Sequence, residues 1–316
     1  MNTQKKYYIG VDISKAKLDF YHPETKRFWT VSNTPTTVKS TLQKISKTLN
    51  KIHIICEPTG GYERTILNQA WNLKIPISLV NPNRARAFAE AMGIVAKTDA
   101  IDSAVLSRFG ETIEPKPFYK PTPLKEKMSA ITRIKDRFTR QAASQKTALK
   151  NVTDNFVKKE LKQQIQNLDR AILRCQKQLD KLIESDQELV DKKRKIESVK
   201  GLGISASTVF LSEMPELGKI TDNQASALVG VAPYNKDTGK QTGKRHVRGG
   251  RSLVRRSLYM PALSATNHNP ILKKFYDRLI ATGKPHHVAI TAVIRKLVRL
   301  VNRLLSDPNF EPIKQN

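Results

Sequence analysis

Two carboxylates three residues apart, Asp99 and Asp102, lie at the start of a helix predicted over residues 97–112. Thr98 is a suitable N-cap for this helix, because its hydroxyl can accept a hydrogen bond from the first turn. Residues three apart share one helix face, so both carboxylates can point at the same position. Carboxylate oxygens are the ligands that Mg²⁺ and Mn²⁺ prefer. The pair alone also has an ordinary explanation, since acidic residues in a first turn complement the helix dipole.

Two further acidic residues are placed by predicted strands. Asp12 interrupts a strand-like run at residues 7–13, where a charge is costly unless it is paired or binds a metal. Glu57 stands at the carboxyl end of a second predicted strand, residues 52–56. Sites in α/β sheets form at the carboxyl ends of strands. Clusters of carboxylates there hold divalent ions that activate a nucleophile in phosphoryl transfer. We therefore expect four carboxylates to meet in one metal-binding pocket: Asp12, Glu57, Asp99 and Asp102.

The elements that must position these carboxylates are three strands, followed by helices that alternate with strands. Strands are predicted at residues 7–13, 18–21, 28–31, 52–56 and 75–80, and helices at 36–49, 62–73, 84–92 and 97–112. The first three strands are expected to form an antiparallel meander, with a His-Pro-Glu turn between the second and the third. This order predicts an α/β domain with a mixed sheet over residues 1–115.

The composition points to a polyanionic partner. The 316 residues contain 56 Lys and Arg against 28 Asp and Glu, a formal charge of +28. Nucleic acid is the partner that this excess favours, and a basic ribosomal or membrane-surface protein is the alternative. Cys56 and Cys175 lack metal-ligand spacing and indicate neither a zinc site nor a disulfide framework. Without a signal-peptide segment or a long apolar run, a soluble protein of the cytoplasm is expected.

The middle of the chain, residues 116–193, is predicted to be a helical spacer. Three prolines at residues 116–123 indicate an extended linker, and two long helical stretches follow, separated by a polar segment at 151–155. The second stretch has apolar residues alternately four and three apart, at Leu161, Ile165, Leu168, Ile172, Cys175, Leu179 and Leu182. This heptad pattern predicts a helical hairpin or coiled coil, used for self-association or for spanning a nucleic acid. An ordinary helical bundle is the alternative.

The carboxyl-terminal region, residues 194–316, is predicted to be mainly helical. Gly201 and Gly203 precede a helix that ends near Met214, and such a turn can bind a phosphate through its backbone N–H groups. It resembles a helix-hairpin-helix element, although any tight connection between helices could have this sequence. Arg295, Arg299 and Arg303 repeat on one face of a later helix, as a second phosphate-contacting ridge or as a solvated cationic face.

A basic loop is the strongest nucleic-acid signal in this region. Residues 238–276 contain neither Asp nor Glu, whereas a solvated surface normally mixes both signs of charge. Four glycines in this stretch allow the backbone to lie along a phosphate chain. Seven cationic residues are predicted to contact nucleic acid: Lys240, Lys244, Arg245, Arg248, Arg251, Arg255 and Arg256.

Four segments carry a resemblance to a known family, and together they span nearly the whole chain. They read IGVDIS, CEPTGGY, VNPNRARAFAEAMGIVAKTDAIDS and LVGVAPYNKDTGKQTGKRHVRGGRSLVRRSLYMPALSA. They resemble the DEDD transposases, recombinases of the insertion-sequence family guided by a bridge RNA, which also includes the Piv-type DNA invertases. The resemblance implies a RuvC-type, RNase H-like domain in which Asp12, Glu57, Asp99 and Asp102 bind Mg²⁺. It further implies a dimerising coiled coil and a separate transposase domain.

The family also implies a nucleophile. At the position of Thr238 it usually has a serine that attacks the scissile phosphate and forms a covalent protein–DNA intermediate. Threonine keeps the hydroxyl but adds a methyl group that crowds in-line attack. Thr238 is therefore the expected nucleophile, and the alternatives are a slow or inactive chain or a role for Ser252. The resemblance also implies donor and target DNA, a guide RNA, and a dimer or tetramer in which each active site draws on two subunits.

These observations predict an α/β plus α protein that acts as a metal-dependent DNA recombinase, most simply an insertion-sequence transposase associated with a bacterial or archaeal nucleoid. A site-specific invertase of the same family would use the same chemistry. Two rivals remain open. One is a RuvC-like hydrolytic junction nuclease, in which water attacks and Thr238 has no role. The other is a basic coiled-coil packaging protein with structural carboxylates.

Overall fold

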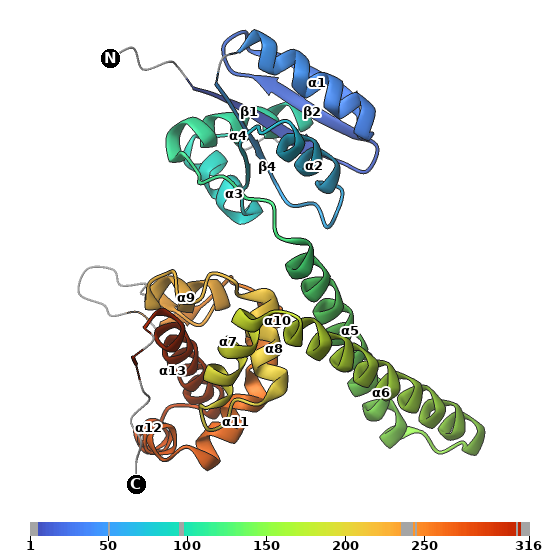
Figure 1. Cartoon of the computed structure of the whole chain (residues 1–316), viewed down its shortest axis with the longest axis vertical. Coiled ribbons are helices and arrows are strands. Elements are labelled where there is room, and N and C mark those ends of the chain that lie inside the picture. The colour runs from blue at the N-terminus through green and yellow to red at the C-terminus, as the bar shows by residue number, and fades with distance from the viewer. Residues whose placement is uncertain are drawn as a thin grey trace. The chain divides into compact units, whose positions relative to one another are not determined.

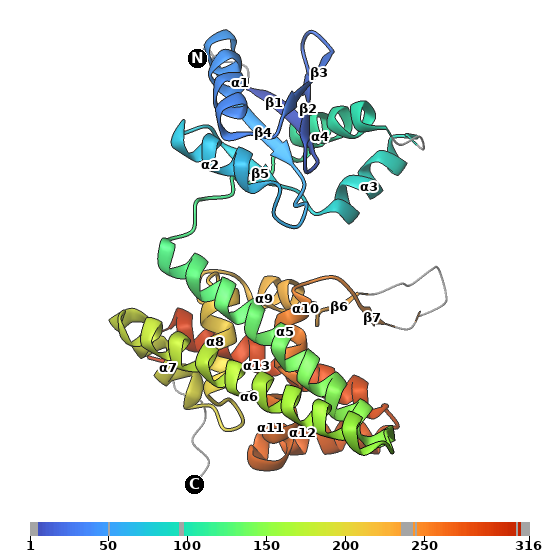
Figure 2. The ribbon, with the colours of Figure 1, turned by 90° about the vertical axis from the view of Figure 1, so that its right-hand side faces the viewer.

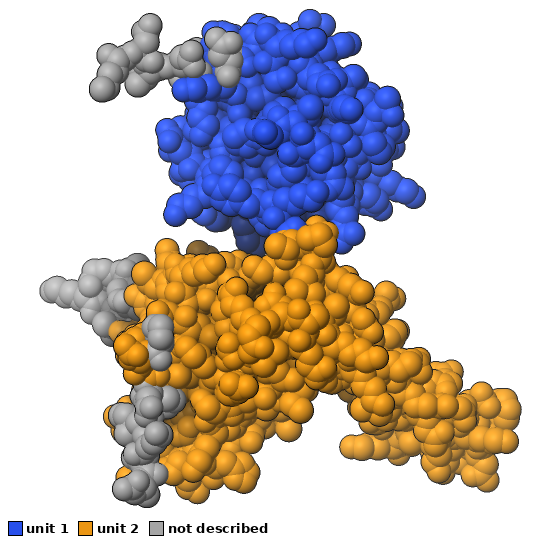
Figure 3. Space-filling model, viewed as in Figure 1, with its two compact units in different colours: residues 1–121 blue, residues 122–316 orange. Residues whose placement is uncertain are grey.

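The computed structural model describes residues 6–49, 51–94, 98–234, 243, 245–307 and 309–310. Contacts within the chain divide it into two compact units, residues 1–121 and 122–316, which Figure 3 draws in different colours. Each unit has hydrophobic core clusters of its own. We therefore describe them separately, as unit 1 and unit 2.

Unit 1 is built on a five-stranded mixed sheet in the order β3-β2-β1-β4-β5. The strands are β1 (Tyr7–Ile13), β2 (Lys17–His22), β3 (Arg27–Ser32), β4 (Ile52–Cys56) and β5 (Ile77–Leu79). The first three pair antiparallel, whereas β4 runs parallel to both β1 and β5. The predicted meander and mixed sheet are confirmed. The last strand is shorter than predicted, in keeping with Pro76, which has no N–H to donate to a ladder.

Helices cover both faces of this sheet (Figure 2). They are α1 (Pro35–Thr48), α2 (Arg64–Asn72), α3 (Pro82–Ala91) and α4 (Asp99–Ile113). One core cluster joins α1 and α2 to one face, and a second joins α3 and α4 to the other. All five residues of β4 are buried, as expected for a strand covered on both sides. The four predicted helices are confirmed to within a few residues at each end.

The contact between α4 and β1 is unusually close, and a glycine makes it possible. A Cβ atom on Gly10 would lie 1.8 Å from the carbonyl oxygen of Ser103 and 2.6 Å from the backbone nitrogen of Ser107. The Ser107 hydroxyl donates a hydrogen bond of 2.5 Å to the carbonyl oxygen of Tyr8. The absence of a Cβ atom at Gly10 therefore allows α4, which carries Asp99 and Asp102, to pack close to β1, which carries Asp12.

Unit 2 is almost entirely helical (Figure 1). Two long helices, α5 (Pro123–Asn151) and α6 (Asn155–Glu184), lie side by side, and shorter helices and strands follow in the part of unit 2 that the structure describes. These are α7 (Gln187–Glu197), α8 (Ile204–Glu213), α9 (Asp222–Val229), β6 (Pro233–Tyr234), β7 (His246–Val247), α10 (Ser252–Ser257), α11 (Tyr259–His268), α12 (Pro270–Ala281) and α13 (His286–Ser306). Val293, Leu297 and Val301 of α13 are fully buried in the core.

The predicted spacer helices are part of this second unit. Met128 of α5 and Leu179 and Ile183 of α6 belong to the same core cluster as α8 and α13. The turn predicted to bind phosphate connects α7 to α8, and Gly201 in it packs against another helix. A Cβ atom at Gly201, whose φ is +104°, would lie 2.6 Å from the Cβ of Ala265 in α11. No helix within the described ranges has the length and apolar character needed to cross a bilayer.

Candidate active site

The β1–β2 hairpin places two carboxylates side by side. Asp12 and Asp19 are Cα partners in the antiparallel pair, so their side chains lie on the same face of the sheet. Asp12 is half-buried, and Asp19 is only 1% exposed. The Thr30 hydroxyl on β3 donates a hydrogen bond of 2.5 Å to Asp19 Oδ1. No local sequence pattern identifies Asp19, and only the register of this hairpin places it opposite Asp12.

The first turn of α4 completes an acidic group that we call the carboxylate cluster: Asp12, Asp19 and Asp99. One carboxylate oxygen from each lies within 4.8 Å of the others. The predicted cap of α4 is confirmed, because the Thr98 hydroxyl accepts a hydrogen bond of 3.3 Å from the Ile101 N–H. A set of oxygen donors at this spacing fits a hard divalent cation such as Mg²⁺ or Mn²⁺.

Electrostatics within the site also fit a bound cation. Burial raises the pKa of Asp12, and repulsion from Asp102, Asp99 and Asp19 raises it further, while a backbone hydrogen bond from Ile13 opposes the rise. Asp102 is therefore close enough to act on Asp12 although it lies outside the carboxylate cluster. The carboxylates destabilise one another when all are ionised, so a cation among them would be bound favourably.

A lysine ammonium already lies at this site. Lys17 Nζ is 2.6 Å from Asp99 Oδ2 and 3.2 Å from Asp19 Oδ2. Hydrogen bonds to these two carboxylates raise the pKa of Lys17. The side chain of Lys17 comes from the start of β2, two residues before Asp19, and therefore lies on the same face of that strand. No local sequence pattern identifies Lys17, because only the packing of α4 against β2 brings it to Asp99, 82 residues away.

Glu57 follows directly after β4, at the carboxyl end of the strand next to β1. Cys56 is the Cα partner of Val11, so Glu57 and Asp12 are the next residues along two paired parallel strands. The structure therefore brings Asp12, Asp99 and Asp102 to one place, adds Asp19, and positions Glu57 at the end of the adjacent strand. The metal-binding role of all of these residues remains a prediction.

The loop after Glu57 is held in shape by its own side chains. Glu63 Oε2 accepts hydrogen bonds from the backbone N–H groups of Thr59 (3.0 Å) and Gly61 (2.8 Å) and from the Thr59 hydroxyl. Asn33 Nδ2 donates to the carbonyl oxygens of Ser14 (2.9 Å) and Tyr62 (3.2 Å). Asn33 thus ties the loop after β4 to the loop after β1, which helps to fix Glu57 relative to Asp12.

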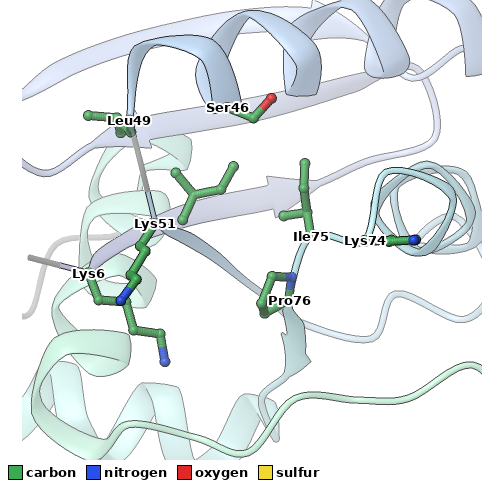
Figure 4. Close-up of a pocket in the computed structure, with 8 residues that line it drawn as sticks. Lys6, Ser46, Leu49, Lys51, Lys74, Ile75 and Pro76 are labelled. Atoms are coloured by element: carbon green, nitrogen blue, oxygen red, sulfur yellow. The ribbon is translucent and has the colours of Figure 1, made fainter. Parts of the chain in front are cut away.

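A separate cationic pocket lies at the opposite end of the parallel strands (Figure 4). Lys6 and Lys51 directly precede β1 and β4, and Lys74 lies shortly before β5. Asp12 and Glu57 lie at the other, carboxyl ends of β1 and β4. The pocket is therefore distinct from the carboxylate cluster.

In unit 2, the predicted nucleophile Thr238 and two predicted contact residues, Lys240 and Lys244, lie outside the described residues. Arg245 and Arg248 are exposed, and the Arg248 guanidinium carbon lies 5.7 Å from the centroid of the Tyr234 ring. Ser252, the alternative nucleophile, is the exposed first residue of α10.

Three of the predicted DNA-contacting arginines have partners within the chain. Arg251 forms a bidentate ion pair with Glu216, with Nη2 2.5 Å from Oε1 and Nη1 2.8 Å from Oε2. Its Nη1 also donates a hydrogen bond of 2.6 Å to the carbonyl oxygen of Glu213. Arg255 Nη1 donates to the carbonyl oxygen of Gly249 at 2.7 Å. Arg256 Nη2 lies 3.0 Å from Asp136 Oδ2. These arginines anchor the basic segment to the helical body of unit 2.

Two of the three arginines repeated on α13 also pair internally. Asp222, in the first turn of α9, lies 3.3 Å from Arg299 and 2.9 Å from Arg303. Burial lowers the pKa of Arg295, and the nearby charges of Arg299 and Arg245 lower it further. Arg245 and Arg295 therefore contribute positive charge to the same part of the surface.

Two family models match the chain. A transposase model, DEDD_Tnp_IS110, matches residues 9–157, and a model described as "Transposase IS116/IS110/IS902 family" matches residues 193–277. The protein is thus a DNA-rearranging enzyme, a transposase or recombinase. The two matches, one from each end of the chain, show that it belongs to the IS110 family of transposases.

Similar proteins agree with this assignment. The pilin gene-inverting proteins of Moraxella lacunata and Moraxella bovis are each 26% identical to the chain, over 93% of it and 94% of their own length. An uncharacterized 43.6 kDa protein of insertion element IS110 from Streptomyces coelicolor is 27% identical over 36% of the chain and 28% of that protein. The family acts on DNA, as the basic composition predicted.

Proposed function

We propose that this chain is an insertion-sequence transposase that breaks and joins DNA by metal-assisted phosphoryl transfer, through a covalent link between Thr238 and DNA. The observation that carries the proposal is the carboxylate cluster, with Asp102 beside it, in a chain of charge +28. Oxygen donors at this spacing suit Mg²⁺ or Mn²⁺, whereas the excess positive charge suits the phosphate backbone.

Each acidic residue has a role in this scheme. Asp12, Asp99, Asp102 and Glu57 would hold the metal, and the buried Asp19 would fix the position of Asp12 and contribute negative charge. The bound metal supplies Lewis-acid stabilisation of the charge that develops on the scissile phosphate. Thr238 Oγ1 forms a bond to phosphorus while the bond to the leaving DNA oxygen breaks, and the proton lost from the Thr238 hydroxyl is balanced by the proton that the leaving oxygen takes up from solvent. The energy of the phosphodiester is thus kept for the joining step.

Further parts of the proposal rest on the family alone. Unit 1 would be an RNase H-like domain of the RuvC type, and α5 and α6 would form a coiled coil that joins subunits into a dimer or tetramer. A structured guide RNA would select donor and target DNA. The protein would act in the cytoplasm, at the nucleoid.

The test is a trapping assay on a denaturing gel, with full-length protein, cognate DNA, guide RNA from the flanking element and Mg²⁺. Parent, Thr238→Ala, Thr238→Ser, Asp102→Ala and Ser252→Ala proteins are compared. We expect a DNA-linked protein band that requires Thr238 and Asp102, increases in Thr238→Ser and persists in Ser252→Ala. Cleavage that survives in Thr238→Ala without any adduct would establish hydrolysis by water instead.

Site-specific inversion is the second candidate, favoured by the gene-inverting relatives that match nearly the whole chain. Both activities form the same adduct, so the products must separate them. A plasmid that carries two sites in inverted orientation yields an inverted segment if the protein is an invertase. A transposase instead yields the element joined to target DNA.

A further inference from the structure

We propose that Lys17 is a built-in counter-ion of the carboxylate cluster, which holds Asp19 and Asp99 in place in the metal-free protein and must leave when a divalent cation binds. The proposal rests on the metal-binding function proposed above. In addition, the Lys17 ammonium competes with the divalent cation for the carboxylates. Lys17 therefore lowers the affinity of the site for its cation.

The geometry around Lys17 gives it two carboxylate partners on different elements. Its ammonium lies 2.6 Å from Asp99 on α4 and 3.2 Å from Asp19 on β2. Asp19 is 1% exposed, and Asp19 and Asp99 are both members of the group whose oxygens lie within 4.8 Å of one another. The ammonium therefore occupies Asp99 Oδ2, an oxygen that a divalent cation at this site would need, and Asp19 helps to hold it there.

The backbone of Lys17 is fixed, whereas its side chain has room to move. The Ser14 hydroxyl donates to the carbonyl oxygen of Lys17 at 3.0 Å and accepts from its N–H at 3.1 Å, and the Ser14 N–H also donates to that carbonyl. The Lys17 side chain is 45% exposed and that of Asp99 is 55% exposed. The ammonium can thus swing into solvent without any change in the hairpin.

The charges explain why such a counter-ion is useful. Carboxylates this close repel one another, and without a cation the exposed Asp99 would be driven away from the buried Asp19. A lysine reduces this repulsion with a single charge on a flexible stem. A charged ammonium has no lone pair for a metal, so it cannot become a ligand. A divalent ion that binds Asp99 must displace it.

The experiment measures Mn²⁺ binding to the full-length protein by electron paramagnetic resonance, with free Mn²⁺ read from its solution signal. Lys17→Met is compared with the parent, and Lys15→Met, an exposed lysine of the same turn, controls for the loss of one positive charge. We expect the Kd for Mn²⁺ to fall by about three- to fivefold in Lys17→Met, the size typical of an exposed ion pair, and to stay unchanged in Lys15→Met.

A second Lys17 variant with a folding check, and a variant of Asp99, distinguish loss of the counter-ion from unfolding and from absence of the metal site. Lys17→Gln, which keeps a polar side chain, should show the same tightening of Mn²⁺ binding. Tryptophan emission, to which Trp29 on the neighbouring β3 contributes together with Trp71, checks that unit 1 is folded in both variants. Unchanged or weaker Mn²⁺ binding in the folded Lys17 variants would overturn the counter-ion role. If Asp99→Asn does not weaken Mn²⁺ binding in an otherwise unchanged protein, the metal site and the counter-ion role fail together.

Discussion

His53 is a fully buried imidazole in the middle of the sheet of unit 1. Its ring stacks on Tyr8 with centroids 5.4 Å apart, and its Nε2 lies 2.9 Å from the hydroxyl oxygen of Ser78. Since that hydroxyl donates to the carbonyl oxygen of Lys116 at 2.7 Å, Nε2 is assigned as the donor to Ser78. His53 Nδ1 has no hydrogen-bond partner among the described residues. The surroundings of the imidazole therefore favour its neutral form, because a proton on Nδ1 would have no acceptor in the described part of the chain.

Burial lowers the pKa of His53 from 6.5 to about 4, with a smaller contribution from the positive charge of Lys6. A lowered histidine pKa means that the unfolded chain binds the proton more tightly than the folded one. Stability is therefore fully present above pH 6.5 and is lost as the pH falls from 6.5 towards 4. The expected loss is about 3 kcal/mol.

The measurement is urea unfolding followed by tryptophan fluorescence, because both tryptophans, Trp29 and Trp71, are in unit 1. His53→Gln cannot take up a proton in this range but can still donate to Ser78, so its stability should change less between pH 7 and pH 4.5. Parallel pH dependence in parent and variant would show that another group causes the loss.

The packing distance between α4 and β1 determines how close Asp99 lies to Asp12 in the candidate active site. Gly10→Ala would place a methyl group 1.8 Å from the Ser103 carbonyl oxygen, and backbone atoms cannot yield as a flexible side chain can. We expect the free energy of unfolding of unit 1 to fall by at least about 2 kcal/mol. Mn²⁺ should bind more weakly, because Asp99 moves away from Asp12.

The control for this change is Lys44→Ala, an exposed position of α1, which should alter stability by less than about 0.5 kcal/mol. Urea unfolding and Mn²⁺ titration of the same preparations give both values. Normal stability and normal Mn²⁺ affinity in Gly10→Ala would mean that α4 can shift without harm to the site.

The sequence predicted most of these elements because their signals are local. Apolar runs such as Ile52–Cys56, the Thr98 cap and the glycine and proline breaks each depend on neighbouring residues alone. Asp12, Asp99 and Asp102 could be selected in the same way, from strand ends and a helix start.

What the sequence could not predict depends on pairing between distant segments. Asp19 joins the site only through the register of the β1–β2 hairpin, and Lys17 only through α4. The acidic partners of Arg251 and Arg256, Glu216 and Asp136, lie 35 and 120 residues away from them. A stretch without acidic residues therefore predicts a loop along a phosphate backbone, although two of its arginines pair with acids from other segments.

Units 1 and 2 have separate hydrophobic cores, and this separation predicts two unfolding transitions. Mg²⁺ bound to the carboxylates would stabilise unit 1, by about 2.7 kcal/mol at one hundred times its Kd, and leave unit 2 unchanged. Tryptophan fluorescence reports on unit 1, whereas far-UV circular dichroism is dominated by the helices of unit 2. We expect Mg²⁺ to shift the fluorescence transition alone.

Asp99→Asn is the matched control, because it should remove most of the Mg²⁺ effect on the fluorescence transition. A single transition that both methods follow, shifted equally by Mg²⁺, would show instead that the two units unfold as one. A shift that persists in Asp99→Asn would place the metal elsewhere.

The segment that leaves unit 1 also covers the open side of β5. The Phe118 N–H donates to the Ile77 carbonyl oxygen at 2.7 Å, and the Trp71 indole N–H donates to the Phe118 carbonyl oxygen at 3.0 Å. Edge strands with free backbone groups recruit strands from other molecules and so begin aggregation. Here a foreign strand would first have to displace Phe118. The connection between the units therefore also protects the sheet from intermolecular growth at β5.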